Sequence, residues 1–163
     1  MKTPLIAGTA VLIGAGGVLL RGPSGCGKSS LALSLIGRGS EDLPVRLVAD
    51  DAAEAVGEDG VVVLRPPRAT RGLIEIRGAG VRRIPFAEAA PLALVVDLSP
   101  DPERLPEPAT CRTPVCGVDV PRVTLDPRNP ANADIVIAIM TALCEGATLP
   151  FEDGPAPPPT GAQ

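Results

Sequence analysis

The chain has 163 residues, the length of a single domain, and its 45% apolar content is enough for a hydrophobic core although Trp and Tyr are absent. Histidine is also absent, which excludes a Ser-His-Asp or Cys-His triad and any zinc site that needs imidazole. A net charge of −4 and the lack of rings that stack on bases argue against nucleic-acid binding. Four cysteines without a C-x-x-C pair are typical of reduced thiols, so we expect a cytoplasmic protein.

An uncharged stretch at residues 3–20 has the length of a signal peptide or a short membrane span. Its glycines divide it into two apolar pieces, 9–13 and 18–20, and this pattern favours two strands joined by a Gly-rich turn. The second piece runs directly into a Gly-rich loop that needs a buried strand before it. We therefore expect no membrane association.

The rest of the chain alternates short apolar runs with turn residues. A helix is predicted over 29–36, and a second, apolar nearly all round and therefore buried, over 131–144. Residues 99–114 are predicted to form a long surface loop, and the Pro-rich residues 147–163 a disordered tail after a domain over 1–146. Strands are predicted at 45–49, 53–56, 61–65, 73–77, 81–85, 92–98 and 115–125.

The most specific motif is GPSGCGKS at residues 22–29, which matches G-x-x-x-x-G-K-[ST] between a predicted strand and a predicted helix. In such a P-loop the backbone N–H groups surround phosphate oxygens, the lysine reaches the outer phosphates and the serine ligates Mg²⁺. We therefore predict an ATP and Mg²⁺ site. The predicted nucleotide-binding residues are Gly22, Pro23, Ser24, Gly25, Cys26, Gly27, Lys28, Ser29 and Ser30.

Carboxylates at strand ends are the candidate partners of this loop. Asp50 and Asp51 follow the apolar run 45–49, where one can hold Mg²⁺ and the other take a proton from an acceptor hydroxyl. Glu75 lies on an alternating strand beside a Gly-rich turn, and Asp97, at the end of another apolar strand, is a rival metal carboxylate. Between residues 65 and 83 there are six Arg and a single acid, a basic patch that suits an anionic partner or phosphate.

Taken together, GVLLRGPSGCGKSSLAL, LVADD, GLIEIRGAGV and VPRVTLDPRN resemble the C-terminal catalytic domain of the HPr kinase/phosphorylase family, in the family's order. The resemblance is to a short form without the usual N-terminal domain. It implies a P-loop α/β domain with a mixed, β-rich sheet, similar to phosphoenolpyruvate carboxykinase. It also implies a homo-oligomer, commonly a hexamer.

The resemblance implies a serine kinase that uses ATP to phosphorylate HPr, the phosphocarrier of the sugar phosphotransferase system, in the regulation of carbohydrate metabolism, and that can reverse the reaction by phosphorolysis. By motif, Asp50 resembles the base that deprotonates the seryl hydroxyl, and Lys28 and Arg104 resemble residues that bind the phosphoryl group. The residues that would surround the metal are Ser29, Asp51 and Glu75.

Two positions depart from the family pattern. Ala7 stands where the family usually has a histidine, and Ser30 where an acidic residue is common. Two alternatives therefore stay open: a small-molecule kinase that uses Asp97 as its metal carboxylate, and a nucleotide-sensing module that binds ATP but has lost transfer.

Overall fold

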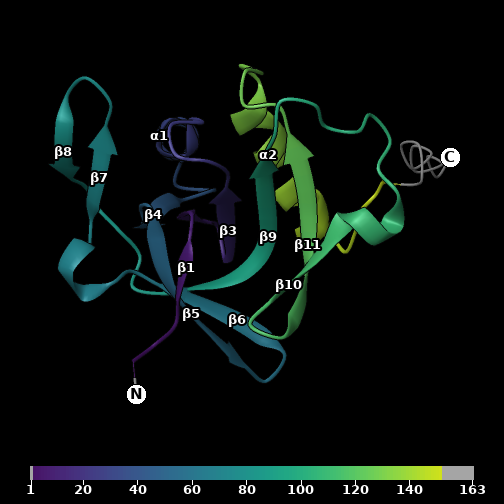
Figure 1. The fold of residues 1–163 in the computed structure, drawn as a ribbon, viewed down its shortest axis with the longest axis horizontal. Helices are drawn as coiled ribbons and strands as arrows, with labels where there is room; N and C mark the ends of the chain where they lie inside the picture. The colour runs from purple at the N-terminus through teal and green to yellow at the C-terminus, as the bar shows by residue number, and fades with distance from the viewer. Residues whose placement is uncertain (1, 152–163) are drawn as a thin grey trace, which may run out of the picture.

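The computed structural model describes residues 2–151. Two α-helices, two 3-10 turns and eleven strands alternate along this part of the chain (Figure 1). Their bounds are β1 Leu5–Ala7, β2 Thr9–Ile13, β3 Gly16–Arg21, α1 Lys28–Gly37, β4 Val45–Ala49, β5 Ala52–Glu58, β6 Val61–Arg65, η1 Arg68–Thr70, β7 Leu73–Ile76, β8 Gly80–Arg83, β9 Ala90–Leu98, η2 Pro108–Cys111, β10 Arg112–Val115, β11 Val118–Leu125 and α2 Asn132–Cys144.

The main sheet has nine strands in the order β1-β5-β6-β9-β3-β2-β4, with the β10–β11 hairpin attached to β9 through β11. Strand β9 is parallel to both β3 and β11, whereas β6 joins its first residues in antiparallel register. The carboxyl ends of β3, β9 and β11 therefore meet at one edge of the sheet. Ligands bind at that edge in open α/β sheets.

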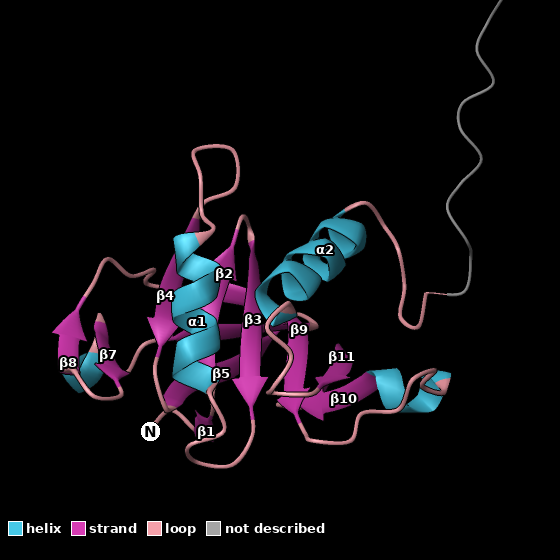
Figure 2. Cartoon of the chain, turned by 90° about the horizontal axis from the view of Figure 1, so that it is seen from above, coloured by secondary structure: helices cyan, strands magenta, loops and turns pink. Residues whose placement is uncertain are grey.

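Helices α1 and α2 cover one face of the sheet (Figure 2), and the β5–β6 hairpin, which belongs to the same sheet, contributes to a second buried cluster. The helix-side core contains Leu20, Leu35 and Val136, all at 0% exposure. On the opposite face, Leu19 and Leu64 belong to this second buried cluster. This mixed, β-rich architecture is the predicted fold class.

Most predicted elements are confirmed. The run 9–20 forms the antiparallel β2–β3 pair, and β5 and β6 form the predicted hairpin. None of the helices within residues 2–151 is long and apolar enough to cross a membrane. Of the predicted tail, residues 152–163 lie outside the described part, while Leu149 packs against the helix-side core.

Three predictions at the C-terminal side are wrong. The loop predicted over 99–114 ends at residue 107, because Pro108–Cys111 form η2 and Arg112–Val115 form β10. The single strand predicted over 115–125 is a hairpin, reversed at Cys116 and Gly117, where φ is 48° and 78°. Helix α2 is buried along one side only, because no layer covers its Ala138 and Thr141.

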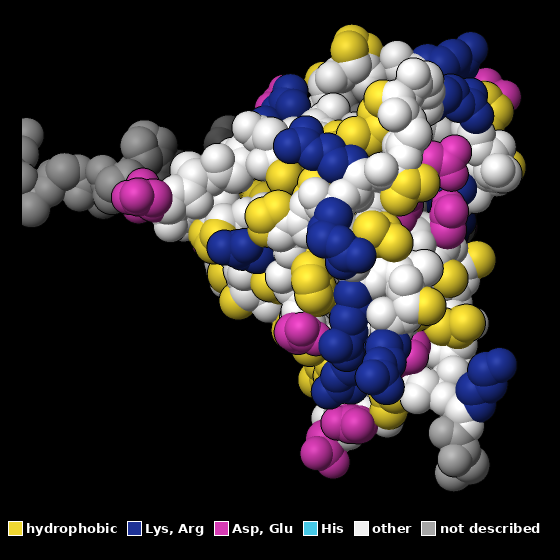
Figure 3. All heavy atoms as spheres, turned by 90° about the vertical axis from the view of Figure 1, so that its left-hand side faces the viewer, with side chains coloured by type: hydrophobic (Ala, Val, Ile, Leu, Met, Phe, Trp, Pro, Cys, Tyr) yellow, Lys and Arg dark blue, Asp and Glu magenta, His cyan; other side chains and the backbone are white. Residues whose placement is uncertain are grey.

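Strands β7 and β8 form a separate two-stranded ribbon that projects at the left of Figure 1. Ile74 is fully buried and anchors the ribbon, whereas all four residues of β8 are exposed. In Figure 3 this side of the molecule faces the viewer and carries many Lys and Arg side chains. The ribbon thus presents part of the basic patch predicted for residues 65–83.

Candidate functional site

The P-loop connects β3 to α1 in the strand–loop–helix order that the motif requires. Gly25 and Gly27 adopt φ of 79° and 102°, a region that side chains rarely tolerate. Lys28 Nζ donates to the carbonyl oxygens of Gly22 at 2.8 Å and Pro23 at 3.0 Å, so it closes the loop on itself. These carbonyls hold the ammonium in the position from which it can turn toward a phosphate.

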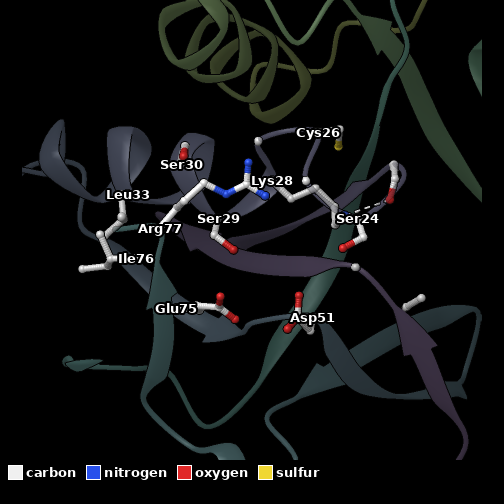
Figure 4. Close-up of a pocket in the computed structure, with 15 residues that line it drawn as sticks. Ser24, Cys26, Lys28, Ser29, Ser30, Leu33, Asp51, Glu75, Ile76 and Arg77 are labelled. Carbon is white, nitrogen blue, oxygen red and sulfur yellow. Dashed lines mark hydrogen bonds between the residues drawn. The ribbon is translucent and has the colours of Figure 1, made fainter. Parts of the chain in front are cut away.

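A cavity of about 550 Å³ lies against this loop (Figure 4). Its walls come from the β1–β2 turn, the P-loop, the first turns of α1, the β4–β5 turn and the ribbon. The lining residues are Ala7, Gly8, Gly22, Ser24, Gly25, Cys26, Gly27, Lys28, Ser29, Ser30, Leu33, Asp51, Glu75, Ile76 and Arg77. The structure thus gathers most of the predicted nucleotide-binding and metal-binding residues, and it puts Ala7 in the same wall.

Asp50 and Asp51 point to different places although they are neighbours in sequence. Asp51 lies at φ 65°, a left-handed conformation that Asp tolerates, and it lines the cavity as an exposed side chain. Asp50 lies beneath the cavity and does not line it. Its Oδ1 accepts hydrogen bonds from Ser29 Oγ at 2.7 Å and Thr9 Oγ1 at 3.0 Å.

The third donor to Asp50 comes from the ribbon, since the backbone N–H of Glu75 donates to Asp50 Oδ2 at 3.0 Å. Both oxygens of Asp50 thus accept hydrogen bonds, and Asp50 joins the P-loop serine to the ribbon. The role of base that the motif implies for Asp50 stays a prediction.

Arg77 is the site residue that the sequence prediction left out. Its Nη2 lies 3.1 Å from the position that a Cβ on Gly25 would occupy, so the guanidinium sits directly over the P-loop. Figure 4 shows its side chain reaching from the ribbon toward Lys28. The available signal was its place two residues after Glu75, because alternation puts Glu75 and Arg77 on one face of the strand.

The oxygen donors around the cavity fit a Mg²⁺ ion that binds a phosphate as well as the protein, and not a metal ion bound by protein side chains alone. Within residues 2–151 no group of three or more His, Cys, Asp or Glu side chains is arranged to hold a metal ion. The cavity does hold oxygen donors of the kind that Mg²⁺ prefers: the Ser29 hydroxyl and the carboxylates of Asp51 and Glu75. Mg²⁺ is usually bound by one or two carboxylates together with substrate phosphates.

Arg104 does not join this site. It lines a second cavity of about 480 Å³ between the loop after β9 and the outer edge of β11. The predicted catalytic role of Arg104 therefore has no support from its position, since the loop carries it to the edge of the sheet rather than over the P-loop.

Asp97 forms salt bridges with two arginines. Arg21 donates through Nε to Asp97 Oδ1 at 2.7 Å and through Nη2 to Oδ2 at 2.9 Å, and Arg122 Nε donates to the same Oδ2. Burial alone would raise the pKa of Asp97, but the hydrogen bonds from Arg21 and Arg122 lower it below its ordinary value. Asp97 does not line the P-loop cavity, so the small-molecule kinase alternative loses its metal carboxylate.

Comparison with known proteins agrees with this geometry. A family model described as the HPr Serine kinase C-terminal domain matches residues 2–145. The chain belongs to this family. The HPr kinase/phosphorylase of Lactobacillus acidophilus is 35% identical over 151 residues, which cover 85% of this chain and 45% of that protein. The Clostridium kluyveri HPr kinase/phosphorylase is 49% identical over 65 residues, which cover 40% of this chain and 20% of that protein.

The fold of this family member is also similar to a solved structure, the HPr(Ser) kinase/phosphatase from Coxiella burnetii. The TM-score is 0.73 at 24% identity, and the match covers 88% of this chain and 99% of that one. The chain spans less than half the length of the curated relatives that it matches.

Proposed function

We propose that this protein is an ATP-dependent serine kinase whose acceptor is a seryl residue of HPr, and that the same site removes the phosphate by phosphorolysis. The observation that carries the proposal is the convergence of a P-loop, two free carboxylates and Arg77 on one cavity. Phosphoryl transfer needs mainly positioning and charge, which these groups supply without histidine. Family membership and the names of the relatives support HPr as the acceptor.

In the proposed reaction the P-loop amides and Lys28 bind the ATP phosphates, and Lys28 exchanges its two carbonyl partners for phosphate oxygens. Ser29 and Glu75 would hold Mg²⁺, which would supply positive charge to the phosphates. Asp50 keeps the Ser29 hydroxyl oriented so that its oxygen lone pairs face the cavity. Glu75 stands beside the phosphate region as a second oxygen donor.

Asp51, rather than Asp50, is the residue that we propose as the base and not as a Mg²⁺ ligand, because its carboxylate is exposed in the cavity and within the described residues no hydrogen bond occupies it. It accepts the proton of the seryl hydroxyl as the oxygen attacks the γ-phosphorus and the bond to ADP breaks. Arg77 faces the region where charge develops on the transferred group. In reverse, inorganic phosphate attacks phosphoserine and leaves as pyrophosphate, and the serine oxygen takes back its proton.

The proposal is tested by incubating the protein with ATP, Mg²⁺ and HPr of the same organism and measuring phosphoserine, and then by supplying phosphoserine-HPr with inorganic phosphate and measuring pyrophosphate. Phosphoserine on HPr supports the kinase. Tight ATP binding without transfer to HPr would instead support a nucleotide-sensing module.

The proposed setting is the cytoplasm, where HPr and ATP are present. By resemblance to the family we also propose a homo-oligomer, with a hexamer as the expected form. A native mass measurement tests this second point independently of activity.

A further inference from the structure

The β7–β8 ribbon, residues 73–83, has a partly buried strand, β7, and a fully exposed one, β8. Its two strands pair only with each other. An isolated two-stranded sheet is marginally stable in water, so an exposed one needs either anchoring or a partner. Ile74 and the Glu75–Asp50 hydrogen bond anchor strand β7, while β8 has no buried residue and Val81 is 67% exposed.

The ribbon and the segment before it carry excess positive charge on an acidic protein. Six of the fifteen Lys and Arg residues fall between positions 65 and 83, three of them in the ribbon, against one acid. Two of these arginines are tied locally: Arg83 donates to the Arg71 carbonyl at 3.1 Å, and Arg71 lies 3.6 Å from Glu88. Arg82 makes no hydrogen bond or salt bridge within residues 2–151, and it is exposed.

The strand register joins this surface to the cavity. Glu75 pairs with Val81, and Leu73 pairs with Arg83. Side chains of paired residues lie on the same face of a sheet, with Cβ atoms about 5 Å apart. Because Glu75 lines the cavity, Val81 and Arg83 lie beside its mouth. None of the residues Val81, Arg82 and Arg83 lines the cavity, so a ligand confined to the cavity would not contact them.

We propose that the unpaired edge of β8, with Val81 and Arg83 on one face of the ribbon and Arg82 on the other, is the docking surface for the protein acceptor. This inference rests on the proposed function. The occupant is a protein surface with an aliphatic side chain close to its seryl residue and acidic side chains further along. The aliphatic group covers Val81, and the acids face Arg82 and Arg83. Only a macromolecule can contact β8 and place a hydroxyl in the cavity at the same time.

The test measures binding of HPr from the same organism to the full chain by calorimetry without ATP, so that no transfer takes place, and measures the KM for HPr separately. The variants are Arg82→Glu and Val81→Asp, with Lys2→Glu as a control that makes the same charge change as Arg82→Glu but away from the ribbon. Both ribbon variants should raise the Kd and the KM for HPr by roughly tenfold. ATP affinity and kcat at saturating HPr should stay as in the parent protein.

Salt and folding provide further readouts. Raising the ionic strength should weaken HPr binding to the parent protein and have less effect on Arg82→Glu, because that variant has already lost the attraction. Unchanged thermal unfolding midpoints show that the variants fold. Arg82→Gln, which removes the charge without reversing it, should have a smaller effect than Arg82→Glu.

The outcomes separate this inference from the proposed function. If HPr is phosphorylated but Arg82→Glu and Val81→Asp bind it as well as Lys2→Glu does, the docking surface is overturned and the kinase stands. If HPr binds through β8 but gains no phosphoserine, the docking surface stands and the kinase is overturned. If HPr neither binds nor reacts, both are overturned.

Discussion

The Ser29 hydroxyl donates to Asp50 over 2.7 Å and so joins the first turn of α1 to the end of β4. The same Asp50 oxygen accepts from Thr9 on β2, and its other oxygen accepts from the Glu75 amide on the ribbon. One carboxylate therefore connects four elements beneath the cavity. Its neighbour Asp51, one residue further on, remains free for chemistry.

The first prediction concerns Asp50 as a positioning residue. Asp50→Asn should weaken nucleotide binding in the presence of Mg²⁺ by about tenfold, because the uncharged amide offers a single acceptor oxygen to the three donors that Asp50 binds and so orients the Ser29 hydroxyl less well. Binding measured with EDTA should change far less. Ser29→Ala should behave like Asp50→Asn, and the double variant should be little worse than either single one, since both changes disrupt the same contact. Fully additive losses would contradict this coupling.

Asp51 is predicted to behave differently. Asp51→Asn should lower kcat for HPr phosphorylation by roughly 10²-fold or more, the usual contribution of a general base. The Kd for ATP should stay within about threefold of the parent value, because the P-loop is unchanged. Asp50→Asn is the matched comparison. A larger loss of kcat in Asp50→Asn than in Asp51→Asn would return the role of base to Asp50.

Gly25, in the P-loop, is predicted to be important for ATP binding. Gly25 has φ 79°, and a Cβ there would lie 3.1 Å from Arg77 Nη2. Gly25→Ala should cost about 1 kcal/mol of stability from the backbone strain and lower ATP affinity by roughly tenfold. Gly60→Ala, at φ 78° in open space, carries similar strain and should leave ATP affinity unchanged. Equal affinities for the two variants would refute the steric explanation.

A fourth prediction follows from the ion pairs of Asp97. Asp97→Asn should lower the free energy of unfolding at pH 7 by about 2 kcal/mol, because two half-buried guanidinium groups lose their shared carboxylate. The folded-state pKa of Asp97 is lowered, so its stabilisation is present above the ordinary value of about 3.9 and is lost as the pH falls through the folded-state pKa.

The gap in stability between the parent protein and Asp97→Asn should therefore be constant near neutral pH and narrow below about pH 4. Urea unfolding at several pH values measures it. Phosphoserine formation by Asp97→Asn, assayed at a temperature where it is folded, should be close to the parent rate. A large loss of this activity by the folded variant would contradict the prediction and give Asp97 a part in phosphoryl transfer.

Cys26 provides a chemical test of the loop. It lines the cavity, and its Sγ lies 2.7 Å from the position of a Cβ on Gly22, so the sulfur fills the turn closely. Alkylation of Cys26 with iodoacetamide should block ATP binding, and bound ATP should protect the thiol. Cys26→Ala should bind ATP and resist the reagent. If Cys26→Ala is inactivated as fast as the parent protein, the exposed Cys116 or Cys144 is responsible instead.

The site was predictable wherever a local motif dictates geometry. The P-loop follows from the spacing of its glycines, and the strand carrying Glu75 follows from the alternation of Leu73, Ile74 and Ile76. Arg77 was visible in the same alternation, but only the packing of the ribbon against α1 brings it over Gly25. The β10–β11 hairpin was missed because Cys116 and Gly117 lack the Asn-Gly or Asp-Gly pair that marks such turns.

By itself, the sequence determined that the protein has no histidine chemistry and that its only internal lysine lies in a phosphate-binding loop, since composition and spacing fix both. Only the tertiary structure decided which carboxylate faces the cavity. Asp50, Asp51 and Asp97 all stand at strand ends and are alike in sequence. The left-handed turn at Asp51, the three donors to Asp50 and the two arginines on Asp97 give them different roles, and these partners come from parts of the chain far apart in sequence.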